Sequence, residues 1–329
     1  MVKSLPVKWS ASRANLLSGC ARRYALQYVL GKQDIEEEGE RQSRWVVDQG
    51  RWRPPRDLMV LVSKDVLRQR LIEANGGIVW SHDTLEATLR RRLKEKISEQ
   101  RLQQEHLSKR MGWDFVPQRR IGPAKLNDLV EEGMKRLVAA ERHPLLCRIL
   151  KGVTDTEWLV PNSLQTFFVD ENQIYAAPDL IIREGRHWRL VRFSGDIFWR
   201  KPSALRRVEI NAMLLWAEDA AGLPNSPRRY KVSRLGWNDG EWVLWSQSGT
   251  QKSRREVRNL ITNDVNSMRK VIRTMGPSRD LDRLAYTQQM WRCRKCSYRW
   301  TCEGASNPVR SRLQQRAVEM EFSRSKLTQ

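Results

Sequence analysis

The stretch ENQIYAAPDLIIREGRHWRLVRFSGD, residues 171–196, carries the strongest fold signal in this chain of 329 residues. Residues 174–182 are rich in side chains that favour strands, and residues 184–186, with a central glycine, supply turn chemistry. Residues 188–193 then alternate well enough for a second strand. The stretch therefore predicts a β-hairpin within an α/β core.

Helical patterns surround this hairpin. In residues 57–150 the pattern is helical, with Leu85, Leu89 and Leu93 recurring every four residues and breaks near Gly76 and Gly122. Further helices are expected at about 203–221 and 254–275. We therefore expect five segments: an N-terminal helix at 1–31, a mainly helical region at 32–150, an α/β core at 151–250, a helix with a cysteine motif at 251–303, and a tail at 304–329.

Four of the five cysteines lie in two widely separated places. Cys20 is near the start, and Cys293, Cys296 and Cys302 belong to WRCRKCSYRWTC near the end. Thiolates are soft ligands that favour zinc or iron–sulfur clusters, and a C-x2-C pair is the usual way to place two of them on one metal. The spacing alone fits one shared four-cysteine site, or a buried Cys20 and a separate set of three thiols.

The residues around these cysteines resemble a known pattern. SASRANLLSGCARRYALQYVLG, residues 10–31, is similar to the opening helix of RecB-family PD-(D/E)XK nucleases that carry a [4Fe-4S] cluster, as AddB-type and CRISPR-adaptation nucleases do. Ala21 stands where that family has proline, and the C-terminal C-x2-C-x5-C matches the closing half of its cluster motif. The resemblance spans residues 10–303. It implies a restriction-endonuclease-like α/β core, with a mixed sheet flanked by helices and a helical insertion.

The resemblance also implies metal ligands. The four cysteines at positions 20, 293, 296 and 302 would hold the cluster and staple the two ends of the chain, with zinc as the alternative metal. Asp179 falls at the family's metal-binding aspartate, Glu157 at an acidic residue that precedes the hairpin, and His82 at a histidine that helps hold the catalytic metal. A lone histidine at a helix start is otherwise a cap or a surface residue.

The second strand departs from the family pattern. It has Arg192-Phe193-Ser194 where an active member carries an acidic residue, any residue and lysine. Because side chains alternate along a strand, Arg192 and Ser194 should point where Asp179 points. We expect Arg192 to replace the catalytic Mg or Mn ion as the partner of Asp179, which leaves a site that does not cut. Three residues could rebuild the site in an active enzyme: Asp196, Lys201 and Glu209.

The charge of the chain indicates a nucleic-acid partner. Sixty Lys and Arg face thirty-eight Asp and Glu, a formal net charge of +22 that attracts polyanions. The best candidate for DNA contact is FWRKPSALRR, residues 198–207, where arginine lies beside a tryptophan that can stack on bases. Its basic residues are Arg200, which follows Trp199, and Lys201, Arg206 and Arg207. Much of the remaining charge fits solvated helix faces.

Three functions are compatible with these features. The favoured one is an inactive nuclease-like subunit that binds single-stranded, double-stranded or guide-paired DNA, or scaffolds a protein complex in recombination, repair or anti-phage and CRISPR-type defence. The second is an active Mg- or Mn-dependent DNase with a rearranged site. The third is a zinc-stapled basic protein that binds RNA or a protein complex.

The sequence also favours a cytoplasmic location without a membrane partner. No apolar run reaches spanning length, and residues 1–10 lack a secretory core. An odd number of cysteines fits a reducing compartment better than a disulfide framework.

Overall fold

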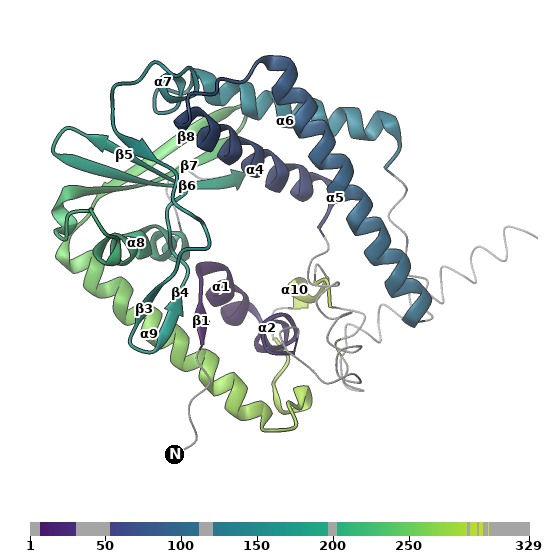
Figure 1. Cartoon of the computed structure of the whole chain (residues 1–329). Coiled ribbons are helices and arrows are strands. Elements are labelled where there is room, and N and C mark those ends of the chain that lie inside the picture. The colour runs from purple at the N-terminus through teal and green to yellow at the C-terminus, as the bar shows by residue number, and fades with distance from the viewer. Residues whose placement is uncertain are drawn as a thin grey trace, which may run out of the picture. The chain divides into compact units, whose positions relative to one another are not determined.

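The computed structural model describes residues 7–30, 53–111, 121–196, 203–287, 290–294, 296–298 and 302 (Figure 1). The chain divides into two compact units. Unit 1 comprises residues 1–11 and 53–263, and unit 2 comprises residues 12–52 and 264–329. Across the described part of the chain, no helix combines the length and the apolar character needed to cross a membrane.

Unit 1 is built on a mixed five-stranded sheet with the order β2-β5-β6-β7-β8. Its strands are β2 (Trp158–Leu159), β5 (Leu180–Glu184), β6 (His187–Asp196), β7 (Tyr230–Asn238) and β8 (Glu241–Ser248). The hairpin strands β5 and β6 pair antiparallel, as do β7 and β8, whereas β6 and β7 are parallel. A parallel pair needs a crossover connection, and α8 (Ala204–Asp219) supplies it.

A layer of helices packs against this sheet (Figure 1). It consists of α4 (Pro55–Asn75), α5 (His82–Met111), α6 (Pro123–Arg142) and the short α7 (Cys147–Leu150). The helix breaks lie at the predicted glycines, and Leu85, Leu89 and Leu93 of α5 are fully buried. These leucines belong to the same apolar cluster as Leu180 and Val191 of the hairpin. The helical region and the α/β core therefore form one hydrophobic core.

A small second sheet interrupts the first predicted strand of the hairpin. The order of this sheet is β1-β4-β3, with β1 (Lys8–Trp9) parallel and β3 (Phe167–Val169) antiparallel to β4 (Asn172–Ile174). The continuous strand predicted at 174–182 is therefore divided between two sheets. One reason is that Pro178, which immediately precedes Asp179, has no N–H to donate to a neighbouring strand.

Unit 2 contains the N-terminal helices and the C-terminal cysteine segment. Its elements are α1 (Ala11–Gly19), which begins at the last N-terminal residue of unit 1, α2 (Ala21–Tyr28), a 3₁₀ turn (Leu281–Arg283) and α10 (Met290–Arg294). The single helix predicted before residue 31 is broken at Cys20, whose φ of −167° and ψ of 114° are extended. The remaining elements are α9 (Gln251–Met275), which runs from unit 1 into unit 2, and a 3₁₀ turn at Pro227–Arg229 in unit 1.

Candidate functional site

Asp179 is a buried carboxylate at the start of β5. It stands one step beyond the Leu180–Val191 pair, which places it opposite Arg192 of β6, and it is only 2% exposed. Its backbone N–H donates to the Val191 oxygen at 2.8 Å, and its Oδ2 accepts the Phe193 N–H at 2.7 Å. The neighbouring strand therefore fixes both the backbone and the side chain of Asp179.

Two cations neutralise this carboxylate. Lys64 Nζ of α4 lies 3.1 Å from Asp179 Oδ2, and Arg192 Nη1 lies 3.5 Å from the same oxygen. Burial alone would raise the pKa of Asp179, but the charges of Arg192 and Lys64 and the Phe193 N–H outweigh it and lower the pKa below its usual value. Asp179 is therefore ionised and paired. The partnership of Arg192 with Asp179 agrees with the sequence prediction.

Further charged groups extend this site across β6, β7 and α8. Glu209 accepts from Arg206 at 2.8 Å and lies 4.0 Å from Arg192. Arg234 is the register partner of Arg192 in the parallel β6–β7 pair, and its Nε donates to Ser194 Oγ at 2.6 Å. Both carboxylates of this site, Asp179 and Glu209, are thus already paired with cations.

Two other predicted metal-site residues lie in different surroundings. Glu157 is exposed and pairs at 2.8 Å with Arg183, near the turn of the hairpin. Arg183 is four residues along the strand from Asp179, a separation of roughly 13 Å. His82 is exposed at the first residue of α5, where Ser81 Oγ caps the helix by accepting the Thr84 N–H. His82 is therefore a surface residue at a helix start, which was the alternative to a metal ligand.

The predicted DNA-contact residues are only partly described. Arg206 and Arg207 are exposed in the first turn of α8. Arg200 and Lys201 lie outside the described residues, and so does the side chain of Asp196.

Sequence reasoning missed Lys64 and Arg234. Lys64 interrupts the apolar run MVLVSKDVL at 59–67, and Arg234 interrupts the strand YKVSRLGW at 230–237. A charge inside an apolar segment is a signal in itself, because buried charges need partners. The partners of these charges cannot be identified from the sequence, because they lie on other elements of the fold.

Cys20 occupies a defined position in unit 2. It is the N-cap of α2, and its Sγ accepts the Arg23 N–H at 3.5 Å. The break between α1 and α2 thus directs the thiol toward the first turn of α2.

The C-terminal cysteines are held on α2 by an apolar contact. The Cys296 N–H donates to the Cys293 oxygen at 3.1 Å, and the Cys302 N–H donates to the Tyr298 oxygen at 2.8 Å. Tyr298 is fully buried and packs against Leu26 of α2. The two distant parts of the chain therefore meet in one unit, as the shared four-cysteine interpretation requires.

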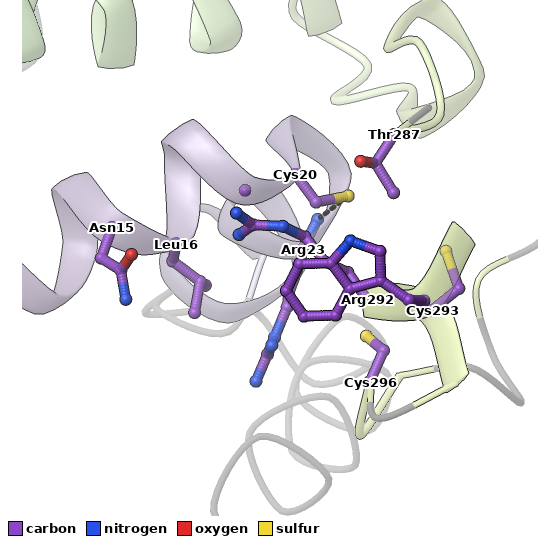
Figure 2. Close-up of a pocket in the computed structure, with 10 residues that line it drawn as sticks. Asn15, Leu16, Cys20, Arg23, Thr287, Arg292, Cys293 and Cys296 are labelled. Atoms are coloured by element: carbon purple, nitrogen blue, oxygen red, sulfur yellow. Dashed lines mark hydrogen bonds between the residues drawn. The ribbon is translucent and has the colours of Figure 1, made fainter. Parts of the chain in front are cut away.

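Three of the four thiols line one cavity of about 250 Å³ (Figure 2). These are Cys20, Cys293 and Cys296, and the lining also includes Arg23 and Arg292. Within the described residues, no three His, Cys, Asp or Glu side chains are grouped closely enough to hold an ion as they stand. None of these cysteines forms a disulfide within the described part of the chain.

The electrostatics of the thiols fit a soft metal centre. Burial, with smaller contributions from the nearby Cys20 and Cys302, raises the pKa of Cys296 to about 11, although the Tyr298 N–H and Arg23 oppose the change. Burial, Cys20 and Cys302 also raise the pKa of Cys293. Closely spaced thiolates repel one another, and a bound cation would remove that penalty. The donor set therefore suits zinc or an iron–sulfur cluster.

Arg22 is a second link between the ends of the chain. It is 1% exposed and donates to the backbone oxygens of Leu281 at 2.8 Å and Leu284 at 3.0 Å. It also pairs with Asp282 at 2.9 Å, and its guanidinium lies 4.2 Å from the ring centre of Tyr286. This single side chain fixes α2 to residues 281–286 without any metal.

Comparison of the chain with models of known protein families gave no match, and a search of curated proteins found no similar sequence.

Proposed function

We propose that this chain is a nuclease-like subunit that holds nucleic acid without cutting it. The observation that carries the proposal is the state of Asp179, which falls where the resemblance places the metal-binding aspartate of the RecB-type nucleases. Its buried carboxylate is paired with Lys64 and Arg192. The likeness in sequence to those nucleases supports a restriction-endonuclease-like core as part of the proposal.

The charge arrangement opposes metal-dependent cleavage. Phosphodiester hydrolysis by Mg²⁺ or Mn²⁺ needs carboxylates that are free to bind the ion. A divalent ion about 5 Å from the Arg192 guanidinium would be repelled by roughly 7 kcal/mol at an effective dielectric of 20. Lys64 would add to that repulsion, so a metal would have to displace two cations before it could reach Asp179.

A rearranged active site is the second candidate. Of the carboxylates that could replace the missing one, Glu209 is paired with Arg206 and approached by Arg192. It is therefore no freer to bind a metal than Asp179 is, which leaves the non-cutting function better supported.

The proposed ligand is a polyanion. The net charge of +22 favours nucleic acid, and Arg206 and Arg207 are exposed beside the altered site. DNA is the proposed nucleic acid because the resembled nucleases act on it. A subunit that binds without cutting is expected to work beside other proteins, in recombination, repair or defence complexes of the kind those nucleases join.

The four cysteines are proposed to hold a [4Fe-4S] cluster, with zinc as the alternative. When bound, such a group would supply a cross-link between α2 and the C-terminal segment. The residues themselves already position this link, because Tyr298 packs the cysteine segment against Leu26 of α2 and Arg22 fixes α2 to residues 281–284. A structural role therefore suits the centre better than a catalytic one, and it would stabilise a contact that the protein also makes without metal.

The test is a combined binding and cleavage assay on protein purified without oxygen. Labelled single- and double-stranded DNA are incubated with magnesium or manganese and the parent protein, Asp179→Asn or the control Asp128→Asn. Asp128 is an exposed carboxylate of α6 that pairs with Lys125. We expect salt-sensitive binding and no cleavage by any of the three.

Two results would contradict the proposal. Cleavage by the parent and by Asp128→Asn, but not by Asp179→Asn, would establish an active nuclease. Failure of the parent to bind either form of DNA would remove the proposed ligand. Iron and zinc analysis of the same preparation distinguishes the two metals, since an iron–sulfur protein is brown and a zinc protein is colourless.

A further inference from the structure

Arg234 is a buried cation in the middle of the large sheet. The residue is 8% exposed, and its Nε donates to Ser194 Oγ at 2.6 Å. Of the carboxylates in the described residues, none lies within ion-pair distance of its guanidinium. By contrast, Arg189 of β6 pairs with Glu184 and also donates to two serines, Ser233 and Ser246.

An uncompensated buried guanidinium is unfavourable for folding. Removing a charge from water costs several kcal/mol unless an opposite charge or several hydrogen bonds replace the water. Burial lowers the pKa of Arg234, repulsion from Arg206 lowers it further, and Glu209 opposes the change. A charge kept at this cost is typical of a site that gains its partner from a ligand.

The described side chains around Arg234 have more positive than negative charge. Among the described side chains, Lys64, Arg192, Arg206 and Arg234 are four cations and the carboxylates that they approach are Asp179 and Glu209, an excess of two positive charges in that set.

The first turn of α8 adds to this excess. It contains Arg206 and Arg207 and no acidic residue. Arginines at a helix N-terminus oppose the helix dipole, whereas an anion there is stabilised by the dipole. Ser203 caps this terminus, since its Oγ accepts the Arg206 N–H at 3.4 Å, so the arginine side chains would be the donors to an anion. Two separate elements, β7 and α8, thus have unbalanced positive charge in the same part of unit 1.

We propose that Arg234 and Arg206, with Ser194 orienting Arg234, form a binding site for a phosphate group. The site rests on the proposed function, since the phosphate would belong to the nucleic acid that the chain holds. Arginine suits this ligand because its planar fork donates two parallel hydrogen bonds to phosphate oxygens. The group bound is either an internal phosphodiester or a terminal phosphate.

The first test replaces Arg234 by methionine and uses Arg189→Met as the matched control on the neighbouring strand. Arg234→Met removes an unpaired buried charge, so we expect Tm to rise by about 4 °C. The same change should weaken DNA binding about tenfold and lower the salt slope of log K by about one. Arg189→Met breaks satisfied contacts and should lower Tm without changing the salt slope.

A second pair of variants acts at exposed positions, where folding is not at risk. Arg206→Gln is compared with Arg91→Gln, since Arg91 is also an exposed helical arginine, paired with Glu95 at 2.9 Å. We expect Arg206→Gln to weaken DNA binding at least threefold and Arg91→Gln less than twofold.

Inorganic phosphate and two forms of DNA complete the experiment. At equal ionic strength, phosphate should raise the Tm of the parent more than that of Arg234→Met. The quantity compared is the difference between the two increases, because phosphate salts stabilise proteins in general. The site is assigned to a terminal phosphate if the parent binds 5′-phosphorylated DNA more tightly than 5′-hydroxyl DNA and Arg234→Met does not show this difference. Equal binding of the two forms, weakened alike in Arg234→Met, assigns it to an internal phosphodiester.

The outcomes separate this inference from the proposed function. If the parent binds DNA and neither Arg234→Met nor Arg206→Gln changes the affinity, the salt slope or the phosphate effect, the phosphate site is overturned and DNA holding stands. If the parent binds no DNA but phosphate protection is lost in Arg234→Met, the proposed function fails and the phosphate site stands.

Discussion

Replacing Asp179 by asparagine should destabilise the protein by about 3 kcal/mol at neutral pH. The structural reason is the pairing of its buried carboxylate with Lys64 at 3.1 Å and with Arg192 at 3.5 Å. Asparagine preserves the size of the side chain and can still accept the Phe193 N–H. The substitution therefore removes the negative charge and leaves two cations facing each other.

The magnitude follows from opposing terms. At an effective dielectric of 20, each cation attracts the carboxylate by about 5 kcal/mol. Desolvation of the three ions offsets much of this attraction, at several kcal/mol per ion, and removing one partner of a buried pair costs about 3–5 kcal/mol net. Lys64 is 29% exposed and can turn toward water, so the lower figure applies. A loss of 3 kcal/mol lowers Tm by roughly 6–12 °C in a unit of this size.

The assay is thermal and urea unfolding of the parent, Asp179→Asn and the exposed control Asp128→Asn between pH 3 and pH 8. The folded-state pKa of Asp179 lies below its unfolded value, so its stabilisation is complete above the unfolded pKa of about 3.9 and is lost as the pH falls through the folded pKa. The gap between the parent and Asp179→Asn should be constant from pH 5 to 8 and shrink below pH 4. Asp128→Asn should change stability by less than about 0.5 kcal/mol.

The opposite result would refute this reasoning. Metal-site carboxylates in an enzyme without its metal repel one another, so removing one commonly stabilises the fold. An Asp179→Asn protein as stable as the parent, or more stable, would mean that Lys64 and Arg192 do not neutralise Asp179.

Three further predictions concern the rest of the chain. Arg22→Met should expose residues 281–286 to limited proteolysis and lower stability by about 3 kcal/mol, because two backbone oxygens and Asp282 lose a buried donor; cleavage kinetics equal to those of the parent would contradict it. Cys20→Ala should lower the iron or zinc bound per chain without unfolding unit 1, as measured by metal analysis and circular dichroism, and unchanged metal content would exclude Cys20 as a ligand. Gly133→Ala should cost about 1–3 kcal/mol in urea unfolding, because its Cβ would lie 2.8 Å from Leu89 Cδ2; no loss would mean that α5 and α6 are not closely packed there.

The cysteine positions show how far a motif can predict a site. Their spacing and the flanking residues predicted that the two ends of the chain meet, and Cys20 and the C-terminal thiols do lie in one unit. The contacts that hold these ends together were not predictable, because two of the partners of Arg22 are backbone oxygens about 260 residues away, at 281 and 284. Backbone acceptors carry no sequence signature.

Local rules determined the hairpin and its paired charges. The central glycine of the turn, the β-rich runs and the two-residue period of a strand were enough to place Arg192 opposite Asp179. The same rules failed where the position of a strand depends on pairing with a distant segment. The run at 174–182 was predicted as one strand, but it is divided because residues 172–174 pair with the N-terminal β1 in a second sheet. Only the tertiary structure brought Lys64 of α4 to Asp179 and buried Arg234 beside Arg192, because both follow from how helices and strands pack. The sequence by itself thus determined which residues share a strand face, and tertiary packing decided which charges are buried together, since burial depends on neighbours that are remote in the chain.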